Sequence, residues 1–153
     1  MKLEDYFEIE GRYEIKDGVY NVDGDAWLKK QVDKLPFKFG KVTCNFYCSD
    51  INLTTLEGCT SWVGGNFDCS NNFLTSLKGC TKSVGGSFEC YNNHLTSLEG
   101  APTHISGSFW CDDNFLTSLK GCPTSVGGYF SCDEILHNTK EYRQYEIIKE
   151  LRK

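Results

Sequence analysis

Cysteine is the residue type in this chain with the widest capacity for chemistry, and its positions repeat. Cys48, Cys69, Cys90, Cys111 and Cys132 form one column with a spacing of 21 residues, and Cys59, Cys80 and Cys122 form a second. Ala101 stands in the second column where a further cysteine would fall. That column therefore selects a small buried side chain, which is how a free cysteine behaves. We predict reduced thiols packed in ladders, with disulfides or a bound metal as the alternatives.

The other reactive residue types do not converge on a catalytic centre. His94 and His104 occupy different positions of the repeat, and His137 lies outside it. Cys44 and Cys48 form a C-x3-C pair, but no second Cys or His pair completes a tetrahedral metal site. The chain also has no nucleophile elbow and no phosphate-binding loop. We expect no catalytic residue, no metal and no cofactor, and interpret the protein as non-enzymatic.

The elements that position these residues come from one unit written three times. VGGNFDCSNNFLTSLKGCTKS (63–83) is followed by VGGSFECYNNHLTSLEGAPTH (84–104) and ISGSFWCDDNFLTSLKGCPTS (105–125), with a looser copy at 42–62 and a truncated one from Val126. Fixed-period similarity of this length is typical of stacked supersecondary units. In each unit Phe and Cys alternate with polar residues, as in a strand with one buried face. The sequence predicts a repeat solenoid: a short right-handed parallel β-solenoid.

Four columns of apolar residues are expected to form its core, beside the cysteines. They are Val42, Val63, Val84, Ile105 and Val126; Phe46, Phe67, Phe88, Phe109 and Phe130; Leu53, Leu74, Leu95 and Leu116; and Leu56, Leu77, Leu98 and Leu119. The Gly-Gly pair before each strand is interpreted as one corner of the coil. The single glycines at 58, 79, 100 and 121 are interpreted as the other corner.

The segment N-x-L-T-S-L after F-x-C-x-x-N resembles the leucine-rich repeat, with Phe and Cys in place of two leucines. It is most similar to repeats of the form F-x-C-x-x-N-x-L-T-S-L-x-G-x-P in a group of bacteriophage proteins. The resemblance covers about residues 22–132. It implies that Asn72, Asn93 and Asn114 bond backbone groups at the turn. It also implies that the strand residues pointing outward line a concave face that meets a partner.

The chain divides into three parts on this interpretation. Residues 1–41 form an N-terminal cap: a hairpin around Lys16-Asp17-Gly18, then a degenerate coil with Trp27 that is one residue short of the period. Residues 42–132 form the leucine-rich-repeat-like solenoid. Residues 133–153 form a C-terminal capping helix with Thr139 as its N-cap and an apolar face of Tyr142, Tyr145, Ile148 and Leu151. A helix that forms a homodimer is the alternative to a cap on a monomer.

Charge and hydropathy exclude two classes of partner. The net charge is −5 and the isoelectric point is near 5.2, which argues against nucleic acid. No apolar run reaches the length of a membrane span. The N-terminal MKLEDYFEIEGR is acidic and lacks the apolar segment of a signal peptide. We therefore expect a cytoplasmic protein that binds neither nucleic acid nor membrane.

The outward positions of the strands change from coil to coil while the core columns stay nearly constant, which is typical of a binding surface. These positions, with the column that follows the repeat asparagines, give the candidate partner-binding residues Tyr47, Asp68, Glu89, Tyr91, Trp110, Asp112, Phe73, His94 and Phe115. Acidic residues with embedded Tyr and Trp resemble interfaces that have aromatic anchors. We predict a protein-protein interaction module, and the resemblance implies a bacteriophage protein that acts on a host protein. The alternative is a protein that binds or sequesters a small ligand in a pocket at its rim.

Overall fold

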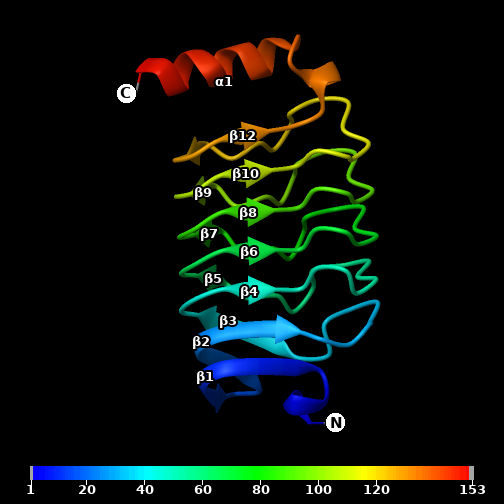
Figure 1. The fold of residues 1–153 in the computed structure, drawn as a ribbon, viewed down its shortest axis with the longest axis vertical. Coiled ribbons are helices and arrows are strands. Elements are labelled where there is room, and N and C mark those ends of the chain that lie inside the picture. Colours follow the sequence, from blue (N-terminus) through cyan, green and yellow to red (C-terminus); the bar gives the residue numbers. More distant parts are fainter. Residues whose placement is uncertain (1, 152–153) are drawn as a thin grey trace.

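Residues 2–151 are described by a computed structural model, apart from the side chains of residues 145, 148 and 149. Two ladders of short parallel strands run along the stack, one on each side of every coil (Figure 1). One ladder comprises β3 (Lys38–Val42), β5 (Trp62–Val63), β7 (Ser83–Val84), β9 (His104–Ile105) and β11 (Ser125–Val126). The other comprises β4 (Phe46–Tyr47), β6 (Phe67–Asp68), β8 (Phe88–Glu89), β10 (Phe109–Trp110) and β12 (Phe130–Ser131). The chain rises as a right-handed coil, as the repeat predicts.

The strands of the first ladder were not predicted from the sequence. The Val column was expected only as part of the core, whereas Val63 of β5 pairs in register with Val84 of β7. The signal was present, since a β-branched residue precedes the glycines in most coils. Because both ladders hydrogen-bond every coil to the next, both sides of the stack rise by about 4.8 Å per coil. Neighbouring coils are therefore spaced alike on the two sides of the stack.

The N-terminal hairpin is confirmed and is longer than expected. After a short 3₁₀ helix, η1 (Leu3–Asp5), strand β1 (Phe7–Lys16) pairs antiparallel with β2 (Val19–Leu28) along its whole length. Asp17 and Gly18 have φ values of 52° and 75°, as a two-residue hairpin turn requires. Gly11 lies opposite Gly24, and a Cβ on Gly24 would collide with the carbonyl oxygen of Glu10. Glycine is required at this point because the two backbones approach so closely.

Strand β2 joins the hairpin to both ladders. Val22 pairs with Val42 of β3, and Ala26 pairs with Phe46 of β4. Both offsets are 20 residues, so the first coil is one residue short of the period, as predicted. Trp27, which was expected to help cap the stack, instead pairs with Tyr47 and lies only partly buried on the outer surface. Ala26, fully buried beside it, closes the core at this position.

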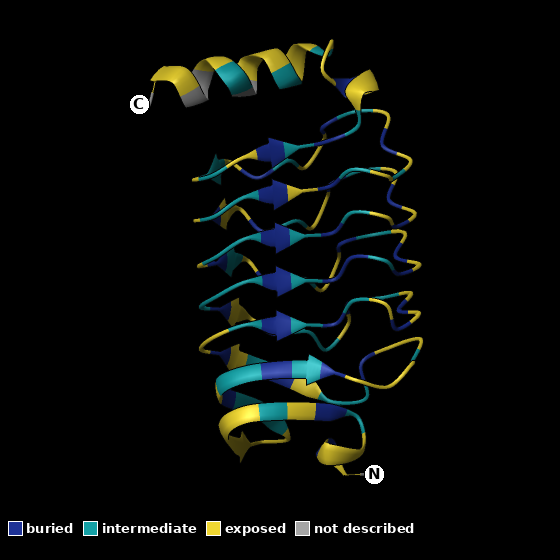
Figure 2. Ribbon diagram, in the orientation of Figure 1, coloured by how far each residue is buried: buried dark blue, intermediate teal, exposed yellow. Residues whose placement is uncertain are grey.

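The core lies between the two ladders and follows the predicted columns (Figure 2). Phe46, Phe67, Phe88 and Phe109 are each 0% exposed, and successive rings lie 5.3–5.7 Å apart between centroids. The leucine columns are buried at the turns that follow the second ladder, without any helix there. The glycines of the second corner all have positive φ, from 83° at Gly58 to 93° at Gly100. The predicted core and this corner are both confirmed.

Buried asparagines tie each coil to the one before it, as the resemblance implied. The Oδ1 atom of Asn72 accepts hydrogen bonds from the backbone N–H groups of Ile51 and Leu53. Its Nδ2 group donates to the carbonyl oxygens of Cys48 and Cys69. Asn93 and the partly buried Asn114 each accept one such N–H and donate to one carbonyl oxygen in each of two coils. Because one amide serves backbone groups of two coils, each asparagine fixes the register of the stack.

At the C-terminal end, only the beginning of the predicted helix is seen to pack against the last coil. The 3₁₀ helix η2 (Glu134–Leu136) places Leu136 in the core at 2% exposure. Helix α1 (Lys140–Leu151) begins as predicted, with the Thr139 hydroxyl accepting the N–H of Tyr142. From the expected apolar face, Tyr142 packs on Phe130 with 5.9 Å between ring centroids, but Leu151 is 82% exposed. Tyr145 and Ile148 lie outside the described side chains. Within residues 2–151, no helix has both the length and the apolar character needed to cross a membrane.

Candidate functional site

The outer surface of the second ladder carries most of the candidate residues, and we call it the front face. It comprises Trp27 of β2, the outward residues of β4, β6, β8, β10 and β12, and the outward residues that follow each of these five strands. In the register of the strands, Trp27, Tyr47, Asp68, Glu89, Trp110 and Ser131 form its central column. From Tyr47 to Ser131, a buried phenylalanine precedes each of these residues and a buried cysteine follows it, whereas Trp27 lies between the buried Ala26 and Leu28. The strand alternation therefore holds each central side chain outward.

Two carboxylates meet at the middle of this column. Asp68 and Glu89 are register partners on adjacent parallel strands. Burial raises the pKa of the Glu89 carboxyl, and the neighbouring charge of Asp68 raises it further. Asp68 accepts hydrogen bonds from the backbone N–H and hydroxyl of Ser70, at 2.9 and 2.6 Å. Among the side chains that the structure describes, no lysine or arginine forms an ion pair with either carboxylate.

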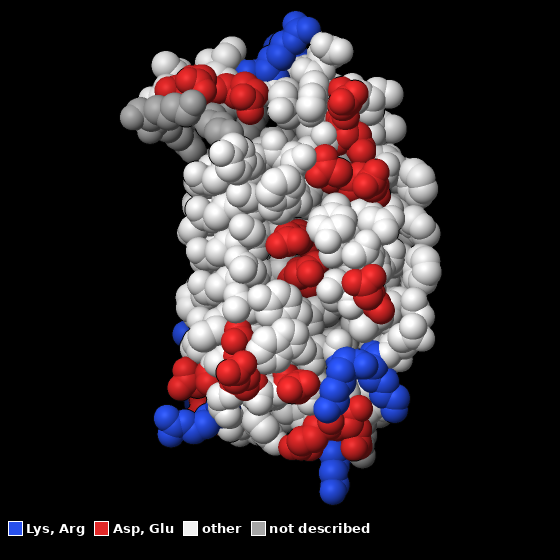
Figure 3. Space-filling view, viewed as in Figure 1, with Lys and Arg blue, Asp and Glu red and all other residues white. Residues whose placement is uncertain are grey.

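The wider electrostatics of the front face follow the same sign. Figure 3 shows carboxylates spread along this face, whereas the lysine and arginine side chains visible in the same view lie near its two ends. Asp112 belongs to the acidic group and accepts a hydrogen bond from the Ser131 hydroxyl at 2.8 Å. The face is thus an anionic surface on which no described cation pairs with the central carboxylates.

Aromatic side chains lie on both sides of the carboxylate pair. Tyr47 is the register neighbour of Asp68, and Trp110 is the register neighbour of Glu89. The Trp110 side chain is 37% exposed. Burial raises the pKa of the Tyr47 hydroxyl, with further contributions from nearby carboxylates. Trp27 stacks on Tyr47, with ring centroids 5.6 Å apart and planes 14° from parallel. Trp27 is the residue of this column that the sequence analysis missed, because its coil departs from the 21-residue period.

The predicted column of Phe73, His94 and Phe115 forms a continuous stack, which we call the aromatic stripe. The His94 ring lies 5.6 Å from that of Phe73 and 5.4 Å from that of Phe115, measured between centroids. Phe73 is 49% exposed and Phe115 is 63% exposed. The stripe lies at the turn after the front face, just beyond the buried asparagines. Tyr91 is half-buried and lies on the front face. In the sequence it falls between a residue of the central column, Glu89, and a residue of the aromatic stripe, His94.

The histidines lie at separate places in the structure, and most of the cysteines are buried in the core. His104 contacts the Thr103 hydroxyl, and His137 contacts the carbonyl oxygen of Cys132 and stacks on Tyr142. All nine cysteines are free, and burial raises the pKa of the Cys59 and Cys122 thiols to about 12. Such thiols are poor nucleophiles near neutral pH. Across the described part of the chain, no group of three or more His, Cys, Asp or Glu residues is arranged to hold a metal ion.

Comparisons of the chain with protein-family models, with curated proteins and with solved structures found no match.

Proposed function

We propose that this protein is a non-catalytic interaction module that binds a protein partner through the front face. One observation carries the proposal: Asp68 and Glu89 lie side by side, with no ion pair to any described side chain, between the aromatic rings of Tyr47 and Trp110. Two neighbouring carboxylates of like charge destabilise each other until a positive group neutralises them. A lysine or arginine side chain of a partner supplies that group.

The aromatic neighbours favour the same kind of partner. The face of a Trp or Tyr ring attracts a cation, and arginine stacks on such rings while its guanidinium group binds carboxylates. Trp, Tyr and Arg are also the residue types that dominate the binding energy of protein interfaces. The aromatic stripe extends the footprint with apolar area. The partner surface is thus basic at its centre and apolar on the side that meets Phe73 and Phe115.

The origin of the partner is a further part of the proposal. The repeat resembles the leucine-rich repeat and, more closely, repeats of bacteriophage proteins, which makes a protein of the infected host the natural target. Binding would then take place in the host cytoplasm. A proteinaceous partner agrees with the acidic front face, which would repel nucleic acid.

Charge neutralisation tests the proposal. Host proteins would be captured on the immobilised parent protein and on Asp68→Asn/Glu89→Gln, and partners would be identified by mass spectrometry. We expect a partner that the parent retains and the double variant loses, with retention falling as salt rises. Glu57→Gln is the matched control, because Glu57 is an exposed carboxylate at the opposite corner of the coil. A partner that binds the double variant as well as the parent would exclude the carboxylate pair as its site.

A further inference from the structure

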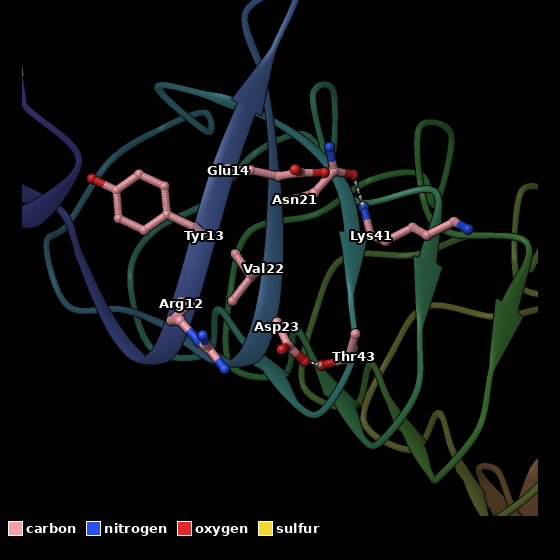
Figure 4. A pocket seen from close by; sticks show the side chains of 8 residues that line it. All are labelled: Arg12, Tyr13, Glu14, Asn21, Val22, Asp23, Lys41 and Thr43. Atoms are coloured by element: carbon pink, nitrogen blue, oxygen red, sulfur yellow. Dashed lines mark hydrogen bonds between the residues drawn. The ribbon is translucent and has the colours of Figure 1, made fainter.

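A pocket of about 490 Å³ lies at the N-terminal end of the stack, away from the front face (Figure 4). Strands β1, β2 and β3 each contribute side chains to it. These side chains include Arg12 and Glu14 from β1, Asn21 and Asp23 from β2, and Lys41 from β3. Thr43, just after the end of β3, also lines the pocket. This is the part of the chain that departs from the repeat, so its residues have no equivalents in the other coils.

The floor of the pocket is held in place by specific hydrogen bonds. The register between β2 and β3 shifts between Tyr20 and Val22, and Asn21 lies at that irregularity. Its Oδ1 atom accepts the backbone N–H of Lys41 at 3.0 Å. The Thr43 hydroxyl accepts the N–H of Gly24 and donates to Asp23 Oδ1 at 3.0 Å. A bulge of this kind commonly re-aims a side chain next to a binding site, and here it orders the polar groups before any ligand arrives.

Among the described residues, three charged side chains that line the pocket have no hydrogen-bond or ion-pair partner: those of Arg12, Glu14 and Lys41. Arg12 and Glu14 are two residues apart on β1, and two residues of a strand span about 6.8 Å, so they project on the same side. In Figure 4 both extend toward β2, whereas the Lys41 side chain extends away from the others. Because Lys41 points away, the described residues present to the pocket the Arg12 cation and the Glu14 carboxylate, with the Asp23 carboxylate close to Arg12 across the strand pair.

From this arrangement we infer that the pocket binds a small zwitterion of the α-amino acid class. The ligand carboxylate pairs with the Arg12 guanidinium, which is shaped to bind a carboxylate through two hydrogen bonds. The ligand ammonium lies between Glu14 and Asp23. A plain anion meets two carboxylates here, and a plain cation meets Arg12, so a ligand with both charges is favoured over either. This site is separate from the front face and does not depend on the proposed function.

L-Alanine is a suitable probe, followed by backbone amide resonances of the whole protein. We expect saturable shifts confined to residues 11–14, 21–24 and 41–43. N-acetyl-L-alanine lacks the ammonium and L-alanine methyl ester lacks the carboxylate, so each should bind about tenfold more weakly or worse. Arg12→Gln and Glu14→Gln should weaken alanine binding by a similar factor. Both positions are exposed, and an unchanged spectrum elsewhere would show that each variant is folded.

Glu8→Gln is the matched control, because Glu8 is an exposed carboxylate on the same strand but outside the pocket. It should leave alanine affinity unchanged, as should the front-face variant Asp68→Asn/Glu89→Gln. Three results would overturn the inference: no saturable shift with alanine, equal binding of either blocked compound, or equal loss of affinity in Glu8→Gln and Glu14→Gln.

Discussion

Asp68 on β6 and Glu89 on β8 are paired in register, so two carboxylates lie one strand spacing apart on the surface of the solenoid. The flanking residues in their column are aromatic and uncharged at neutral pH. Such a pair weakens the isolated protein, which is a cost that a binding surface can recover when a cation of the partner arrives. The energetic consequences can be measured without knowing the partner.

Glu89→Gln should stabilise the protein at neutral pH by about 0.5 kcal/mol, a small value because the pair is partly exposed and screened. The folded-state pKa of Glu89 lies above its ordinary value of 4.5. Folding therefore takes up a proton between these two values. The unfavourable contribution of the carboxylate is absent below the ordinary value and grows as pH rises through the folded-state pKa. Urea unfolding of parent and variant across this range should give curves that separate with rising pH. A variant that is less stable than the parent at neutral pH would contradict this account.

Trp110→Ala should cost about 2–4 kcal/mol of partner affinity, as at an interface hot spot. Its effect on the melting temperature should be small, because the side chain points outward from β10. Phe73→Lys and Phe115→Lys should also weaken binding if the aromatic stripe belongs to the same footprint. Thr124→Ala, in the connecting segment, should have no effect. Full affinity of a well-folded Trp110→Ala would exclude the centre of the front face and direct attention to the termini.

Asn93→Leu should destabilise the fold by about 3 kcal/mol, because it leaves buried backbone groups of two coils unpaired. Asn93 is 3% exposed, accepts the N–H of Leu74 at 2.9 Å and donates to the carbonyl oxygens of Cys69 and Cys90. The adjacent Asn92 is the control. It is exposed, and its φ of 51° means that Asn92→Ala should cost only about 1 kcal/mol. Equal losses in urea unfolding would show that the buried amide has no special role.

Thiol labelling of the native protein should distinguish the cysteines by burial. Cys44 is exposed and should react quickly, whereas Cys48, Cys69, Cys90, Cys111 and Cys132 are buried and should react only after unfolding. Burial raises the pKa of the Cys59 thiol to about 12, so little reactive thiolate is present at mildly alkaline pH. Reductant should leave the melting temperature unchanged. A large fall on reduction would mean that disulfides stabilise the protein.

Much of the solenoid can be predicted from the sequence because repeat neighbours are also spatial neighbours. A residue in one coil lies beside the residue 21 positions later, as Phe67 does beside Phe88. Columns in the sequence are therefore contacts in the structure, and burial, stacking and the corner glycines can be inferred from them. The Asp17-Gly18 turn and the Thr139 cap were also predictable, because both depend on local backbone geometry.

The features without a periodic partner were decided by tertiary structure. Strand β2 joins two ladders, and this alone places Trp27 on the front face and brings Arg12 and Glu14 to a pocket beside Asn21. Leu136 falls 21 residues after Phe115, at the repeat position of the aromatic stripe. Its side chain nevertheless lies in the core. In these segments, contacts depend on how an end of the stack meets non-repeating chain. Composition and period determined the stack, whereas packing at its ends determined which side chains remain available to a ligand.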